Sequence, residues 1–232
     1  MKRETSNKIR FVIEDLLPPI IRDSGAFRLA AHAVFGNYVD AASEFRRRAP
    51  FLTEAEYTSF YRDSPHIHSG TDNSEACLQR VAQDVVGFSV CDVGCGTGYL
   101  LRYIREISRT KPARLVGTEI VVPQLPENIG IEFFEGRVES LPFKNQEFDT
   151  VICTHVIEHV LDYRNAIAEL RRIAAKRLII VVPMERESLY TFNPHFNFFA
   201  YPHSFLRAMI PVPEQHVCEL IGRDIYYRED LS

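Results

Sequence analysis

The sequence lacks the features typical of disulfide-rich proteins, of proteins with a structural zinc site and of membrane-spanning proteins. Its five cysteines are an odd number and form no C-x-x-C pair, which fits neither a disulfide framework nor a structural zinc site. The longest apolar stretch, 178–182, stops at Pro183 and is far shorter than the roughly 18–20 residues of a membrane span. Because no apolar segment follows the charged N-terminus, we identify no signal peptide and expect a cytoplasmic protein without a membrane span.

A surplus of positive charge is missing as well. The 232 residues include 27 basic and 31 acidic side chains, for a formal net charge of −4. Nucleic-acid binding draws much of its affinity from basic side chains that face phosphates, so we expect no nucleic-acid partner. The only basic run, Arg46 to Arg48, follows a helical pattern and is interpreted as a solvated helix end rather than a recognition surface.

The chain does have the composition of a folded domain, with 46% hydrophobic residues, and its texture changes near residue 88. Before that point, apolar spacing and capping residues predict helices from Ser6 to the Pro18-Pro19 pair, over about 27–47, after the capping box of Thr53 and Glu56, and after Ser74. After it, short apolar runs predict buried strands at 88–93, 114–118, 131–134, 148–153 and 177–182, with amphipathic helices at 98–109 and 163–175.

This alternation of strands and helices predicts an α/β fold. We expect a Rossmann-like, doubly wound, mostly parallel sheet preceded by a helical cap, with two short closing strands between 217 and 227. In such sheets the ligand crevice lies at the carboxyl ends of the strands. The search for a functional site can therefore be confined to those ends.

The first predicted strand ends in a glycine-rich loop, D-x-G-x-G-x-G, at 92–98. Glycines at alternate positions let the backbone turn sharply and approach a ligand, while the following helix offers free N–H donors. The loop therefore predicts a nucleotide-like ligand. The dinucleotide fingerprint G-x-G-x-x-G would need a glycine where Tyr99 stands, which disfavours NAD without eliminating it. Glu119 ends the next strand, where an acid can accept both hydroxyls of a ribose.

Several motifs in this order resemble the class I S-adenosylmethionine-dependent methyltransferases, especially their small-molecule branch. They are CDVGCGTG at 91–98, the acid Glu119, the stretch 136–160, a helix, and RLIIVVP at 177–183. The resemblance covers about 75–183. It implies the class I methyltransferase fold, S-adenosyl-L-methionine as cofactor with S-adenosyl-L-homocysteine as product, and a small-molecule acceptor.

The resemblance also implies which residues bind the cofactor. It places the methionine portion of the cofactor against Asp92, Gly94, Cys95, Gly96 and Gly98, and the ribose against Glu119. It places the adenine beside Arg137 and Val138. It also assigns Cys153, Thr154 and His155 to the site, where the fourth strand opens onto it. The family commonly has an acid where this chain has Arg137. Since a guanidinium has no acceptor capacity, the adenine must be held by backbone groups and stacking, or Glu139 must swing in.

An H-x-x-E-H pattern, His155 to His159, follows the fourth strand. In a helical turn its two imidazoles and the carboxylate of Glu158 would share one face. Some related O-methyltransferases carry E-x-x-E-H here and bind a divalent metal, whereas Glu-His is common in the family without one. We expect no metal, and keep His155, Glu158 and His159 as the candidate ligands if one binds. His155 and His159 are the catalytic candidates, because a neutral imidazole suits deprotonation of a hydroxyl.

Two further segments carry histidines. A polar loop at 61–70 contains His66 and His68, and an aromatic segment at 190–203 contains His195 and His203. The aromatic segment could form a wall over an acceptor or pack against the N-terminal helices.

These features define our expectations for domains and function. We expect a helical cap or lid at 1–74 and a cofactor-binding methyltransferase domain at 75–232, with an acceptor-side insertion at about 184–216. The expected function is methyl transfer to a small-molecule acceptor, by O-methylation. The alternatives are a cofactor-binding regulatory protein without catalysis and an NAD-type oxidoreductase. The oligomeric state stays open.

Overall fold

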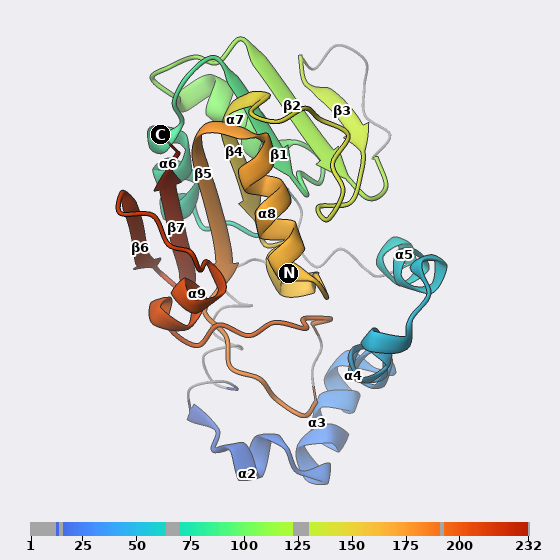
Figure 1. The fold of residues 1–232 in the computed structure, drawn as a ribbon. Coiled ribbons are helices and arrows are strands. Elements are labelled where there is room, and N and C mark those ends of the chain that lie inside the picture. Colours follow the sequence, from blue (N-terminus) through green and yellow to red (C-terminus); the bar gives the residue numbers. More distant parts are fainter. Residues whose placement is uncertain (1–12, 14–15, 64–69, 123–129, 191–192, 232) are drawn as a thin grey trace.

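A computed structural model describes residue 13 and residues 16–63, 70–122, 130–190 and 193–231. Within these ranges one seven-stranded sheet, in the order β3-β2-β1-β4-β5-β7-β6, carries helices on both faces (Figure 1). Its strands are β1 Ser89–Val93, β2 Arg114–Glu119, β3 Glu132–Glu135, β4 Phe148–Thr154, β5 Ala174–Pro183, β6 His216–Ile221 and β7 Asp224–Asp230. Strands β1 to β5 are parallel, and β7 is antiparallel to both of its neighbours. The predicted doubly wound, mostly parallel α/β sheet and its closing strands are confirmed.

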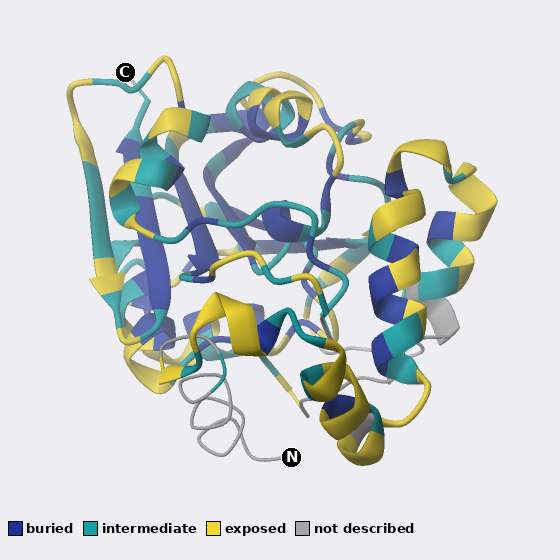
Figure 2. Ribbon diagram, turned by 90° about the horizontal axis from the view of Figure 1, so that it is seen from below, coloured by how far each residue is buried: buried dark blue, intermediate teal, exposed yellow. Residues whose placement is uncertain are grey.

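Burial on both faces explains why the predicted strands are continuous apolar runs. Along β5, Ile179 and Val181 pack toward α6 (Glu75–Asp84) and α7 (Tyr99–Ile107), while Leu178, Ile180 and Val182 pack toward α8 (Tyr163–Ile173) and α9 (Pro202–Ala208). Figure 2 shows the central strands in dark blue and helices with exposed, yellow outer sides. Because both faces are covered, a ligand can reach this sheet only at its edges or at the strand ends.

The N-terminal helices lie on the side where the parallel strands end (Figure 1). They are α2 Pro19–Arg22, α3 Gly25–Phe35, α4 Tyr38–Arg48, η2 Ala49–Phe51 and α5 Glu54–Asp63. Both predicted caps are confirmed: the Thr53 N–H donates to the Glu56 carboxylate over 2.8 Å, and the Ser74 hydroxyl accepts from the Cys77 N–H. Helices α5 and α6 therefore begin where their capping residues predict.

The single helix predicted over 27–47 is wrong, because the structure has two helices there. Gly36 has a φ of +64°, a conformation that glycine adopts at little cost and that ends a helix. The chain then restarts at α4, which leaves Asn37 between the two helices. The helix predicted from Ser6 lies almost wholly outside the described residues.

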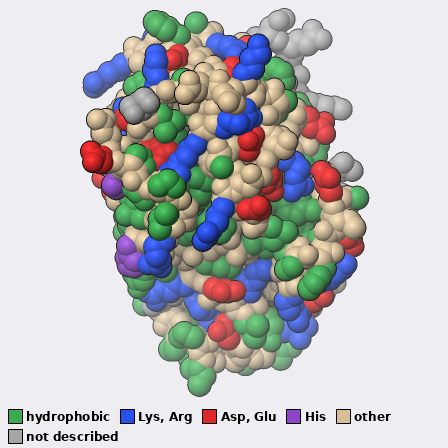
Figure 3. Space-filling view, viewed as in Figure 1, with side chains coloured by type: hydrophobic (Ala, Val, Ile, Leu, Met, Phe, Trp, Pro, Cys, Tyr) green, Lys and Arg blue, Asp and Glu red, His purple; other side chains and the backbone are tan. Residues whose placement is uncertain are grey.

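Within the described ranges, no helix combines the length and the hydropathy that a membrane span needs. On the face seen in Figure 3, basic and acidic side chains are interspersed rather than gathered by sign.

A buried ion pair joins α8 to the closing hairpin. Glu229 on β7 is 0% exposed, and the Arg171 guanidinium donates to both of its carboxylate oxygens over 2.7 Å. The Tyr227 hydroxyl donates to the same carboxylate over 2.6 Å. Because this carboxylate is buried, losing its partners would leave an uncompensated charge inside the fold and destabilise the β6–β7 hairpin.

We expect Arg171→Met to lower the free energy of unfolding by about 3 to 5 kcal/mol, because it leaves the Glu229 carboxylate buried without its cation. Arg164→Met, on the exposed side of the same helix, should change it by less than about 0.5 kcal/mol. Urea unfolding followed by circular dichroism measures both variants. Equal stability of the two would show that the pair does not stabilise the hairpin.

Candidate functional site

The glycine-rich loop follows β1 and turns into α7. Gly94, Gly96 and Gly98 have φ values of +75°, +52° and +72°, which side chains rarely tolerate. Gly94 also has no room for a side chain, since an added Cβ would lie 2.2 Å from the Val156 side chain. A Cβ at Gly96, by contrast, would meet nothing within 4 Å. The middle of the loop therefore presents its backbone to open space.

Glu119, the last residue of β2, contacts this loop directly. The Gly96 N–H donates to one of its carboxylate oxygens over 2.9 Å, and the Ile120 N–H donates to the other over 3.0 Å. The two features that the sequence singles out for a nucleotide-like ligand thus meet in the folded chain. The Glu119 carboxylate lies where a ligand seated on the glycine loop would be within its reach.

Asp92 lies beneath the same loop and is 1% exposed. Burial, reinforced by the negative charge of Glu119, raises the pKa of the Asp92 carboxyl to about 7. Its Oδ1 atom has no hydrogen-bond partner among the described residues. A buried acceptor of this kind suits a ligand that brings a positive charge or an N–H donor.

A cleft of about 190 Å³ runs from the glycine loop to the histidines after β4. Five of the predicted site residues line it: Gly94, Glu119, Val138, His155 and His159. The remaining lining residues are Tyr57, Val93, Ile120, Gly136, Glu139, Val156 and Val160. Residues at the ends of β1, β2 and β4 therefore line the same cleft as Tyr57 of α5.

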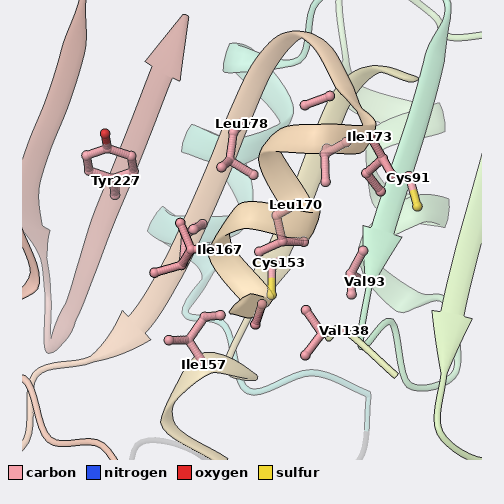
Figure 4. Packing of buried hydrophobic residues seen from close by; sticks show 14 of the residues in the cluster. Cys91, Val93, Val138, Cys153, Ile157, Ile167, Leu170, Ile173, Leu178 and Tyr227 are labelled. Carbon is pink, nitrogen blue, oxygen red and sulfur yellow. The ribbon is translucent and has the colours of Figure 1, made fainter. Parts of the chain in front are cut away.

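Seven predicted cofactor-binding residues are not among those that line the cleft: Asp92, Cys95, Gly96, Gly98, Arg137, Cys153 and Thr154. Cys95 and Cys153 are buried in the hydrophobic core, where burial raises the pKa of each thiol; Figure 4 shows Cys153 beside the α8 residue Leu170. The Thr154 hydroxyl is also buried and accepts from the Asn73 side chain over 2.9 Å. These three side chains are therefore part of the packing around the site and do not line the cleft.

Arg137 is held by its neighbours. Its guanidinium donates to Glu139 over 3.1 Å and lies over the Tyr57 ring, 4.8 Å from the ring centroid. The Glu139 side chain lines the cleft, so an acceptor is present although position 137 itself carries none. The arginine links the adenine side of the predicted site to α5.

The H-x-x-E-H pattern does not form one regular helical turn. His155 has a φ of +56° and precedes a short 3-10 turn that covers only Ile157–His159. The Glu158 carboxylate still lies between the two imidazoles, 3.6 Å from His155 Nδ1 and 4.0 Å from His159 Nε2. The spacing thus brings the three groups together, although not on one helix face.

The two imidazoles differ in their electrostatic surroundings. Burial opposes charge on His155, but its contact with Glu158 and the charge of Asp224, 3.9 Å away, raise the pKa of His155 above its usual value. Burial and the neighbouring His195 lower the pKa of His159 to about 4. His155 therefore holds a proton more readily than an ordinary histidine, whereas His159 stays neutral near pH 7.

Sequence reasoning missed Tyr57 and Glu185 around these histidines, and it named His195 only as part of the segment 190–203. The Tyr57 hydroxyl donates to the His159 carbonyl over 2.7 Å. The His195 ring lies edge-on to that of His159, with centroids 4.6 Å apart, and its Nδ1 is 2.5 Å from the Glu185 carboxylate. The two histidines of 190–203 were the only signal in the sequence, and nothing in the spacing paired His195 with His159. His66 and His68 lie outside the described residues.

Comparisons with known proteins show what this sequence resembles. A family model described as a methyltransferase domain matches residues 91–182. The uncharacterized methyltransferase YcgJ of Bacillus subtilis is 29% identical over 131 residues, which are 53% of this chain and 49% of that protein. The malonyl-[acyl-carrier protein] O-methyltransferase of Pectobacterium atrosepticum is 29% identical over 87 residues, 38% of this chain and 34% of that protein.

A third relative is the ubiquinone biosynthesis O-methyltransferase of Chelativorans sp., which is 28% identical over 112 residues, 45% of this chain and 40% of that protein. This chain spans at most about half the length of these three relatives. Residues 91–182, which match the family model, include the glycine loop, the acid that ends β2 and the histidines after β4. These residues match the model of a methyltransferase domain, which covers less than half of this chain.

Proposed function

We propose that this protein transfers a methyl group from S-adenosylmethionine to a hydroxyl of a small-molecule acceptor. The observation that carries the proposal is a single cleft with the Gly96–Glu119 contact near one end and His155 at the other. A cofactor seated at the first end would point its reactive part toward the second. The O-methyltransferases among the relatives support the choice of oxygen as the acceptor atom.

The residues at the glycine loop fit this cofactor. The carboxylate of Glu119 would accept the ribose hydroxyls, and Val138 and Glu139 would contact the adenine from the cleft wall. The buried Asp92, whose Oδ1 has no partner among the described residues, would balance the positive end of the methionine portion. When bound, S-adenosylmethionine supplies a methyl group on a positively charged sulfur, which is a good leaving group.

At the other end of the cleft, His155 is the proposed general base. Its Nε2 atom has no hydrogen-bond partner among the described residues. Glu158 and Asp224 lie 3.6 Å and 3.9 Å from its ring nitrogens, so both carboxylates would stabilise the imidazolium formed when the ring takes the acceptor's proton. His159, with a pKa of about 4, is too weak a base and would orient its neighbours instead.

The helical cap, which we assign to 1–74, is proposed as the acceptor-side lid of the domain at 75–232. Its described part reaches the cleft through Tyr57, which is buried and contacts both Arg137 and the His159 carbonyl. The insertion at about 184–216 would complete the acceptor side, since His195 reaches the same histidines. A cleft of about 190 Å³ favours a small acceptor group.

Glu119→Gln should weaken binding of S-adenosylhomocysteine roughly 10- to 100-fold, because hydrogen bonds to a charged carboxylate are stronger than those to an amide. Glu135→Gln, on the exposed end of β3, is the matched control and should bind like the wild type. Isothermal titration calorimetry measures both. Equal affinity in the two variants would refute this placement of the ribose.

His155→Asn should lower kcat about 10²- to 10⁴-fold, the usual contribution of a general base, while leaving affinity for S-adenosylhomocysteine unchanged. Asparagine tolerates the positive φ at this position, so the backbone should be retained. His203→Asn, at an exposed site on α9, is the control. Methyl transfer is measured against a panel of phenols, catechols and carboxylates.

The same panel separates the proposal from its main alternative. A wild-type protein that binds S-adenosylhomocysteine but methylates no member of the panel would favour a regulatory cofactor-binding protein. Full activity of His155→Asn would instead remove His155 as the base.

A further inference from the structure

Three metal-ligating side chains converge beside the acceptor end of the cleft. One ligand atom from each of Glu158, His159 and His195 lies within 4.8 Å of the other two. The first two come from the turn after β4, and the third comes from the segment between β5 and α9. The cluster therefore depends on tertiary packing and differs from the set of His155, Glu158 and His159 that the sequence spacing suggests.

The backbone clamps the two segments together. The N–H groups of Phe196 and Asn197 both donate to the Glu158 carbonyl, over 2.7 Å and 3.1 Å. The Asn197 side-chain amide donates to the carbonyls of Ile157 and Val160, over 2.8 Å and 2.6 Å. These contacts hold the donors near one another without any ligand, which is the arrangement expected of a preorganised site.

Each imidazole of the cluster has an acceptor at its Nδ1 atom. His195 Nδ1 is 2.5 Å from the Glu185 carboxylate, and His159 Nδ1 is 3.3 Å from the Pro194 carbonyl. Metal-binding histidines commonly donate one ring N–H to a carboxylate or a backbone carbonyl, which fixes the tautomer and turns the other nitrogen toward the ion. Both rings are thus oriented to present Nε2.

Glu158 gives an independent reason to place a cation here. Its side chain is 1% exposed, and its Oε2 atom has no hydrogen-bond partner among the described residues. Its other oxygen is shared between His155 and His159 at 3.6 Å and 4.0 Å. A buried carboxylate with one unsatisfied oxygen is costly, and a bound cation would satisfy it.

We propose that Glu158, His159 and His195 bind one zinc-like divalent ion. Two imidazoles and one carboxylate form a donor set used by zinc sites that keep a fourth position open, and imidazole favours zinc over magnesium. His159 also lines the cleft, so the ion would lie at its acceptor end. This proposal stands independently of the methyl-transfer proposal, because it concerns metal binding alone.

The test is a titration of the full chain with Zn²⁺ after removal of metal by a chelator and dialysis. We expect one zinc per chain, with excess Mg²⁺ failing to displace it. Glu185→Gln should weaken zinc binding about 10- to 100-fold, the usual effect of removing an outer partner, and His195→Ala should weaken it further. His203→Ala is the matched control and should bind zinc like the wild type.

Three results would overturn the proposal. They are a wild-type protein without stoichiometric zinc, unchanged zinc affinity in His195→Ala, and loss of zinc in His155→Ala with retention in His195→Ala. Circular dichroism and urea unfolding check that each variant is folded. If His195→Ala does not fold, Glu185→Gln decides the matter, together with the visible absorption of Co²⁺ bound at the site, which should change in that variant. Failure of methyl transfer would leave these readouts unaffected.

Discussion

The shared direction of β1 to β5 is the constraint on which the site depends. Parallel strands place all their carboxyl ends at one edge of the sheet, and a doubly wound sheet leaves that edge open for a ligand. Gly94 follows β1, Glu119 ends β2, and His155 follows β4. These residues are far apart in the chain but line one cleft, because each stands at the end of its own strand.

Buried negative charge shapes both ends of that cleft. At the glycine loop, burial, reinforced by the charge of Glu119, raises the pKa of Asp92 to about 7. At the far end, Glu158 is buried among imidazoles. Charges removed from water are costly unless a partner offsets them. A positively charged cofactor at the first end and a cation at the second would each supply such a partner, and this common logic links the two proposals.

The sheet and the cofactor end of the cleft could be predicted because their signals are local. A continuous apolar run indicates a strand that is buried on both faces. A run of alternate glycines between a strand and a helix indicates a tight turn that exposes its backbone. The prediction over 27–47 was wrong where a single residue, Gly36, overrode a helical pattern on both of its sides. After β4, the H-x-x-E-H stretch does not lie on one helix face because His155 adopts a positive φ, which spacing alone does not reveal.

By itself the sequence determined the order of strands and helices, the glycine loop and the acid that faces it, since each is encoded by neighbouring residues. Only the tertiary structure decided what surrounds the histidines. Tyr57 reaches them from α5, and His195 reaches them from beyond β5, held by the backbone contacts between Glu158 and Asn197. Such contacts depend on how segments that are distant in the sequence pack together, and no spacing pattern in the sequence encodes that packing.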